Sequence, residues 1–289
     1  MVTATMRALA AHDEREELRG RDYLAEIFLT QDRKRPLQDP AARAWVMKNK
    51  ITPGAYEFML ARTAFFDQVV EQALEGNIPQ IVFLGAGYDS RPYRFQNLIQ
   101  GTRIFELDAP PTQQRKQESL RQANVSIPQQ LTFVPINFDT DDLKDTLARA
   151  GYRRDERTLF VWEGVTYYLS LQAVDSILSF VRTNSALDSS ICFDYAALSR
   201  EALSENGAQK LREQLKTDHP GEPTKFGIRE GELEAFMSER GYRIVEHLTS
   251  SDMEEKYLTL RDGSSVGKPP ALLRLVHAAV AGEAPMNGS

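Results

Sequence analysis

The first residues that suggest chemistry form a glycine turn after a short apolar run. Residues 81–84 are apolar, and Gly85-Ala86-Gly87 follows directly. This order is typical of a buried strand that ends in a tight loop before a helix. Because glycine has no Cβ, the backbone at Gly85 and Gly87 can approach a ligand closely, and the next helix offers unpaired N–H groups. The turn predicts a ligand at the end of the first strand without specifying which one.

Two acidic residues narrow the choice of ligand. Asp108 lies 23 residues after Gly85, at the end of the predicted second strand, where a carboxylate can accept the hydroxyls of a ribose. Asp89 lies in the loop itself, where it would repel a pyrophosphate, and Ser90 replaces the third glycine of the dinucleotide fingerprint. An adenosyl group with an ammonium-bearing amino-acid tail suits this loop better. The alternative is that Asp89 caps the following helix.

The elements around these residues predict an α/β fold. Helices are expected at 5–29, 41–49 and 55–74, with a proline-containing loop between the first two. Strands are then expected at 81–84, 102–107, 131–136, 158–162, 190–195, 242–248 and within 271–280. Alternation with helices favours a mostly parallel sheet covered on both faces. Pro135 lacks an N–H for a neighbouring strand, so its strand should lie at the sheet edge or end at this residue.

We expect one integrated domain with three parts. Residues 1–78 are predicted to form a helical lid, residues 79–280 the ligand-binding core, and residues 281–289 a disordered tail. The lid and the polar segment 198–225 should cover the ligand end of the strands.

Composition and charge exclude several classes of protein. The 289 residues carry a net charge of −6, which argues against nucleic-acid and anionic-membrane partners. No apolar run is long enough to span a membrane, and the N-terminus lacks the apolar core of a signal peptide, so a cytoplasmic location is expected. The single cysteine, Cys192, and four histidines without ligand spacing predict no metal site. We expect a monomer or a homodimer.

Three linked motifs carry a family resemblance. They are Leu-Gly-Ala-Gly-Tyr-Asp-Ser-Arg at 84–91, Phe-Glu-Leu-Asp at 105–108 and Trp-Glu-Gly-Val-Thr-Tyr-Tyr-Leu at 162–169. Together they resemble the leucine carboxyl methyltransferase family, which includes bacterial and fungal O-methyltransferases of secondary metabolism. The resemblance runs from about residue 56 to residue 257. It implies a class I methyltransferase, Rossmann-like fold with a seven-stranded sheet that binds S-adenosyl-L-methionine.

The resemblance also implies cofactor contacts from residues that precede and follow the first strand in the sequence. Arg62, in the helix before that strand, matches the arginine that pairs with the cofactor carboxylate. The glycine turn, Gly85-Ala86-Gly87, matches the family's loop, and Asp108 matches its ribose acid. Arg62 would otherwise be a surface residue with its stem packed on the helix.

Two further contacts follow from the resemblance. Where the family has an Asp-Leu pair near the adenine, this chain has Asn137-Phe138, which keeps hydrogen-bonding capacity but removes the charge. Glu163, followed by Gly164, matches the family's glutamate after the fourth strand. The alternative for Glu163 is a helix-capping acid.

The expected reaction is O-methylation of a carboxylate on a small molecule or a peptide. A carboxylic acid with a pKa of about 4 is ionised at neutral pH and needs no general base, and the motifs hold no obvious His or Lys base. Alignment and exclusion of water would then supply the catalysis. A hydroxyl or phenol acceptor, which benefits from a base, is the nearest alternative. A nicotinamide-dependent oxidoreductase and a non-catalytic adenosyl-binding protein are the others.

Position along the chain suggests residues for the acceptor. Tyr168 and Tyr195 are predicted to position it, and Tyr23, Tyr167 and Arg229 to bind it. Tyr167 and Tyr168 are equally compatible with a core role, or one of them can face the sulfonium with its ring.

Overall fold

The computed structural model describes residues 2–138, 140–198 and 226–282. Most of the segment 198–225, and residues 283–289 of the expected tail, lie outside these residues. The division into a lid and a core stays a prediction.

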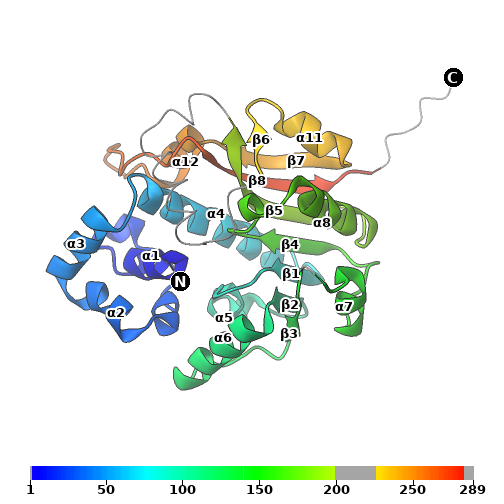
Figure 1. Ribbon diagram of the computed structural model, residues 1–289, viewed down its shortest axis with the longest axis horizontal. Coiled ribbons are helices and arrows are strands. Elements are labelled where there is room, and N and C mark those ends of the chain that lie inside the picture. Colours follow the sequence, from blue (N-terminus) through cyan, green and yellow to red (C-terminus); the bar gives the residue numbers. More distant parts are fainter. Residues whose placement is uncertain (1, 139, 199–225, 283–289) are drawn as a thin grey trace.

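A mixed β-sheet of eight strands organises the fold (Figure 1). Its order is β3-β2-β1-β4-β5-β8-β7, and the short β6 pairs with β5. The strands are β1 (Gln80–Leu84), β2 (Arg103–Asp108), β3 (Leu131–Pro135), β4 (Thr158–Trp162), β5 (Ser190–Leu198), β6 (Ile228–Arg229), β7 (Tyr242–Leu248) and β8 (Leu273–Val280). Pairing is parallel except that β8 runs antiparallel to both β5 and β7. The predicted mostly parallel sheet is confirmed, and β6 is an addition to it.

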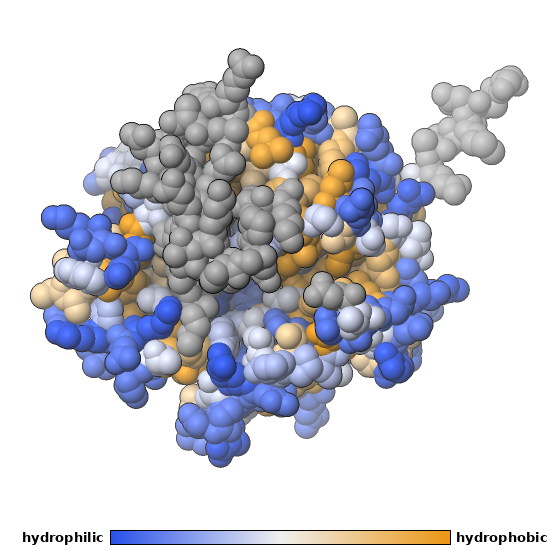
Figure 2. Space-filling view, in the orientation of Figure 1, coloured by the Kyte–Doolittle hydropathy of each residue, from blue (hydrophilic) through white to orange (hydrophobic). Residues whose placement is uncertain are grey.

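Helices cover both faces of the sheet. The α-helices are α1 (Val2–Ala11), α2 (Gln31–Gln38), α3 (Pro40–Asn49), α4 (Ala55–Glu75), α5 (Arg91–Arg94), α6 (Pro110–Gln122), α7 (Leu143–Arg149), α8 (Leu171–Thr183), α11 (Leu233–Glu239) and α12 (Ser250–Tyr257). Short 3-10 turns are η1 (Glu16–Leu18), η2 (Ala25–Phe28), η3 (Gln96–Leu98) and η4 (Thr166–Tyr168). Residues of α4, α6 and α12 share one apolar core with one face of the sheet, and α7, α8 and α11 share a second core with the other. On the side of the molecule seen in Figure 2, hydrophilic residues (blue) border areas of hydrophobic residues (orange).

Pro135 ends β3 at the edge of the sheet, as predicted. It lies opposite Asp108 of β2, and β3 has no further neighbour among the described strands. A proline is tolerated there because no second strand needs its missing N–H.

Residues 5–29 do not form the single helix expected from the sequence. The chain turns back after α1, since the Gly20 N–H donates to the Ala10 carbonyl at 2.9 Å. A Cβ at Gly20 would lie only 3.0 Å from the Cβ of Ala10, so any larger residue would crowd this close approach. The expected proline loop is also wrong, because Pro36 lies inside α2 and Pro40 begins α3, a position where proline is favoured.

The parallel strands bring the predicted ligand-binding residues together at the carboxyl-terminal ends of the central strands. Gly85 follows β1, Asp108 ends β2 and Glu163 follows β4. Because β1, β2 and β4 run in the same direction, these three residues lie at the same, carboxyl-terminal, end of their strands. Among the described residues, no helix is both long and apolar enough to cross a membrane.

Candidate active site

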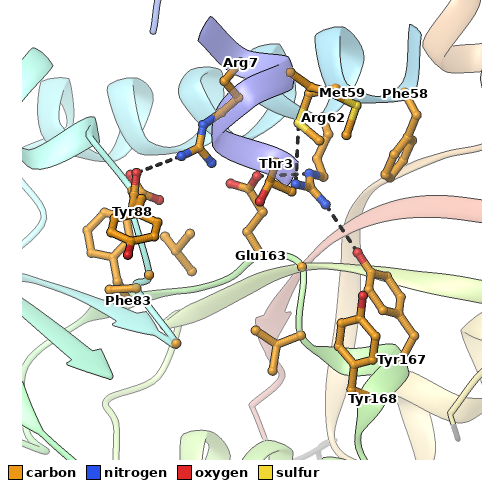
Figure 3. Close-up of a pocket in the computed structure, with 18 of the residues that line it drawn as sticks. Thr3, Arg7, Phe58, Met59, Arg62, Phe83, Tyr88, Glu163, Tyr167 and Tyr168 are labelled. Carbon is orange, nitrogen blue, oxygen red and sulfur yellow. Dashed lines mark hydrogen bonds and ion pairs between the residues drawn. The ribbon is translucent and has the colours of Figure 1, made fainter. Parts of the chain in front are cut away.

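A cavity of about 610 Å³ lies at the carboxyl ends of the central strands. Its walls come from α1, α2, α4 and α6, from the start of β8 and from the ends of β1, β2 and β4 with the loops that follow β1 and β4. Figure 3 shows part of this lining. The predicted site residues that line it are Arg62, Gly85, Ala86, Gly87, Asp89, Asp108, Glu163, Gly164, Tyr167 and Tyr168. In the described part of the chain, no cluster of three or more His, Cys, Asp or Glu side chains suits a metal ion.

The glycine turn holds the Asp108 carboxylate beside the cavity. Gly85 and Gly87 have φ angles of 71° and 46°, and a Cβ at Gly85 would meet the Val165 side chain at 3.1 Å. The Gly87 N–H donates to Asp108 Oδ2 at 2.5 Å, and the Ala109 N–H donates to Oδ1 at 2.7 Å. Each carboxylate oxygen keeps a further lone pair, so Asp108 can still accept ribose hydroxyls.

Arg62 is buried, which excludes the alternative of a surface residue. Its Nε lies 3.0 Å from Glu163 Oε1, and its Nη1 donates to Asp194 Oδ2 at 3.0 Å. The Tyr167 hydroxyl donates to the same Asp194 oxygen at 2.6 Å. Among the described residues, Nη2 meets only the Met59 sulfur, at 3.6 Å. The guanidinium is therefore fixed by acids on one side and retains donors for an anion in the cavity.

Glu163 is an ionised carboxylate, and one of its oxygens is paired with Arg62 by charge without a well-aligned hydrogen bond. Its Oε2 accepts from Arg91 Nη1 at 2.7 Å. Burial alone would raise the pKa of Glu163, but Arg91 and Arg62 lower it to about 2. Its buried Oε1 has no well-aligned hydrogen bond with any described residue, although it lies close to Arg62. A ligand ammonium would satisfy this oxygen while Arg62 holds a carboxylate, so the pair fits an amino-acid tail.

Asp89 lines the cavity but is already engaged by its own loop. Its Oδ1 accepts from the Arg91 N–H at 2.8 Å, at the start of α5, and its Oδ2 accepts from Arg91 Nη1 at 2.6 Å. The Asp89 side chain thus bonds the first N–H of α5, although Ser90 is the N-cap residue of that helix, and the predicted cofactor contact of Asp89 stays a prediction. Arg91 in turn bonds Asp67 Oδ1 at 2.8 Å, which ties the loop to α4.

The N-terminal segment supplies site residues that sequence analysis missed. Arg7 lines the cavity, and its Nη2 donates to the Tyr88 carbonyl at 2.7 Å (Figure 3). Its Nε lies 2.8 Å from Asp22 Oδ2, and the Ser90 hydroxyl donates to Asp22 Oδ1 at 2.5 Å. No local pattern pointed to Arg7 or Asp22, because their contact depends on the turn after α1.

Asp194 was missed in favour of its neighbour, Tyr195. Side chains alternate along β5, so Asp194 faces the cavity side and Tyr195 packs in the opposite core. The Tyr195 hydroxyl lies 3.0 Å from His247 Nε2. Tyr195 is not among the residues that line the cavity, so the structure gives it no contact with an acceptor there.

Four other predicted residues also lie outside the cavity lining. Tyr23 is 62% exposed, because the turn after α1 points it to the surface. Arg229 is exposed and lies 3.6 Å from Glu232. Asn137 and Phe138 are exposed where the chain leaves β3, close to Asp108 along the sheet edge. An adenine beyond the ribose acid would cover the latter two, and their role stays a prediction.

The chain matches a family model and several curated proteins. The model of the leucine carboxyl methyltransferase family matches residues 1–182. YktD of Bacillus subtilis, a candidate S-adenosyl-L-methionine-dependent methyltransferase, is 31% identical over 220 residues, 75% of this chain and 70% of YktD. A second candidate methyltransferase of this kind, SCO7813 of Streptomyces coelicolor, is 31% identical over 180 residues. That alignment covers 62% of each chain, a little under two thirds of the relative.

Solved structures with low sequence identity share the fold. A candidate methyltransferase of Thermobifida fusca superposes with a TM-score of 0.60 at 15% identity, over 96% of this chain and 94% of its own. A DUF574 family protein of Streptomyces avermitilis gives 0.60 at 12% identity, over 96% of each chain. These likenesses confirm the class I methyltransferase fold and nothing finer. The family is shown by the match of the family model over residues 1–182: the chain belongs to the leucine carboxyl methyltransferase family.

Proposed function

We propose that this protein is an S-adenosyl-L-methionine-dependent O-methyltransferase that methylates the carboxylate of a small molecule or peptide. The cofactor is S-adenosyl-L-methionine, as in the curated relatives. One observation carries the proposal of a carboxylate acceptor. The cavity that holds the cofactor residues is also lined by two arginines, Arg33 and Arg115, with no carboxylate partner among the described residues.

The cavity residues fit both ends of this cofactor. Arg62 would hold its carboxylate and Glu163 Oε1 its ammonium, while Asp108 would accept the ribose hydroxyls beside the glycine turn, 85–87. When bound, the cofactor supplies an electrophilic methyl group on a positively charged sulfur.

The remaining cavity residues favour an acceptor that arrives already ionised. No histidine or lysine lines the described cavity. The acids there are engaged: Glu163 with two arginines, Asp89 with Arg91, and Asp108 with backbone N–H groups. Burial raises the pKa of Tyr167 well above its usual value, so its hydroxyl is a poor base. Among the described residues that line the cavity, a hydroxyl acceptor would therefore find no group suited to remove its proton.

A carboxylate acceptor removes this difficulty. An ionised acceptor would present an oxygen lone pair to the methyl group that the bound cofactor supplies. No proton moves, so the protein's contribution is alignment and water exclusion. Arg33 and Arg115 add a favourable field for an anion entering the cavity.

The test is the chemistry of the methylated product. The protein is incubated with methyl-labelled S-adenosyl-L-methionine and matched carboxylic acids, alcohols and phenols. The proposal expects methyl esters, which mild base hydrolyses to methanol, whereas methyl ethers resist base. Base-stable products alone would assign the enzyme to hydroxyl methylation.

Cofactor binding is tested separately by titration calorimetry. The protein is expected to bind S-adenosyl-L-methionine and S-adenosylhomocysteine but not NAD. Asp108→Ala removes charge-assisted hydrogen bonds and should raise the cofactor Kd about 10- to 100-fold. Asp155→Ala, at an exposed position, is the control. An unchanged Kd in Asp108→Ala would place the ribose elsewhere.

A further inference from the structure

We infer that the acceptor is an amphipathic carboxylic acid whose apolar body packs on one defined wall of the cavity. The apolar wall consists of Met6, Ile51, Ala55, Phe58, Met59 and Leu273, all of which line the cavity. The inference rests on the proposed carboxyl methylation and adds the class of acid. It excludes small polar di-acids and sugar acids as good substrates.

The apolar wall lies mostly on elements other than the loops that hold the cofactor, and α4 contributes both to the wall and, through Arg62, to the cofactor site. The cofactor residues lie mostly on the loops after β1, β2 and β4. The apolar wall comes from α1, from the chain that leads into α4, from α4 itself and from the start of β8. Phe58, Met59 and Leu273 are each less than 5% exposed, so these side chains are held in the core that backs the cavity.

The apolar wall begins beside the groups that would hold the amino-acid tail. The Arg62 guanidinium lies 5.6 Å from the centre of the Phe58 ring, and its Nη2 lies 3.6 Å from the Met59 sulfur. Figure 3 shows Phe58 and Met59 grouped around Arg62, while Phe83 and Tyr88 lie at the other end of the view. An acceptor on the apolar wall would therefore lie next to the cofactor tail rather than at its adenosyl end.

A cavity with this division selects for two properties at once. Each methylene or ring carbon that the acceptor buries on the apolar wall makes the free energy of binding more favourable. Arg33, which donates to the Thr5 hydroxyl at 3.4 Å and lines the same cavity, offers a positive charge for the acid group. A polar di-acid would have to bury its second charge against methionine, isoleucine and phenylalanine side chains, which is costly.

The experiment compares two series of equal chain length. Linear carboxylic acids from butanoate to decanoate, and the corresponding primary alcohols, are assayed for kcat/KM with S-adenosyl-L-methionine. The Kd of each acid for the S-adenosylhomocysteine complex is measured by calorimetry. We expect kcat/KM and affinity of the acids to rise about fourfold per added methylene until the apolar wall is covered. The alcohols should remain unmethylated.

The outcomes separate this inference from the proposed function. Methylated acids whose kcat/KM is flat or falls with length would overturn the apolar wall while leaving carboxyl methylation intact. Alcohols methylated with the same length dependence, and acids not, would overturn carboxyl methylation while leaving the apolar wall. If no acid or alcohol were bound or methylated, both the apolar wall and the proposed carboxyl methylation would be overturned.

Variants of Met6 test the apolar wall directly, since Met6 lies on α1, is half-buried and lines the cavity. Met6→Gln is close in size but polar, and it should lower kcat/KM for decanoate about tenfold while changing kcat/KM for butanoate much less. Met6→Leu should keep the length dependence. Ile127→Gln, at an exposed position outside the cavity lining, controls for general effects of a polar substitution. An equal loss for butanoate and decanoate in Met6→Gln would show that Met6 does not contact the alkyl chain of the acceptor.

Discussion

Replacing Arg62 by methionine should show how much the free energy of unfolding depends on one buried charge. Arg62 is the only arginine that pairs with Asp194 among the described residues, at 3.0 Å. Glu163 keeps a second arginine, Arg91, at 2.7 Å. In Arg62→Met, Asp194 would retain only the Tyr167 hydroxyl and the Gly164 N–H, at 2.6 and 2.7 Å. A fully buried carboxylate would thus lose its only counter-ion.

The expected loss of stability is large at neutral pH and smaller in acid. Removing one partner of a buried ion pair costs about 3–5 kcal/mol. Burial already raises the pKa of Asp194, and Arg62 opposes that rise, so the substitution raises this pKa further. A carboxyl group whose pKa is higher in the folded than in the unfolded state favours folding below its unfolded pKa, and that contribution is lost as pH increases. The variant should therefore lose more stability at pH 8 than at pH 5.

Urea unfolding followed by circular dichroism at pH 5 and pH 8 provides the measurement. A loss of 3–5 kcal/mol corresponds to a midpoint shift of about 1–2 M. The double variant Arg62→Met/Asp194→Asn should recover part of the loss at pH 8, because the neutral amide can keep the bonds to Tyr167 and Gly164. Equal losses at the two pH values, with no recovery in the double variant, would refute the idea that Asp194 is left as an unpaired charge.

Two further predictions concern Asp22, which contacts the cofactor loop, and Glu106, a buried acid of β2. Asp22→Asn removes the charge that faces Arg7 at 2.8 Å and keeps a partner for the Ser90 hydroxyl, so the loop should loosen and the cofactor Kd should rise about tenfold. Calorimetry that finds wild-type affinity would count against this role of Asp22. Burial, opposed by Lys116, raises the pKa of Glu106 to about 7, so its contribution to stability is present in acid and lost as pH rises through that value. Unfolding free energy should therefore fall more between pH 5 and pH 8 in the wild type than in Glu106→Gln, and equal slopes would contradict the shift.

The sheet was predictable because most of its strands carry a local sequence pattern. Apolar runs bounded by Gly, Pro and Asp predicted the parallel strands, and Pro135 predicted the edge position of β3. The helices were less visible where side chains are polar. α12 was missed although Thr249 and Asp252 form a capping box at its start, a pattern that sequence alone can reveal. α2 was missed because Pro36 and its charged neighbours are typical of a loop.

The site was predictable only as far as single residues carry chemistry. Arg62, Asp108 and Glu163 were identified from motif and position, and all three line the cavity. The side chains that bond them were not identified. Asp194, which pairs with Arg62, lies 132 residues away along the chain. Such a pair follows from the register of β5 against its neighbours, and no local pattern encodes it. Counting alternate residues along β5 was the one available signal for Asp194.

The antiparallel β8 has a consequence for the way the protein is made. β7 reaches the sheet only through β8 among the described strands, yet β7 precedes β8 in the sequence. During synthesis, residues 242–248 must therefore remain without a strand partner until residues 273–280 have left the ribosome. The start of β8 also supplies Leu273 to the cavity wall. A nascent chain can thus gather its cofactor-binding loops early, but it completes both its sheet and its cavity only when this late strand inserts.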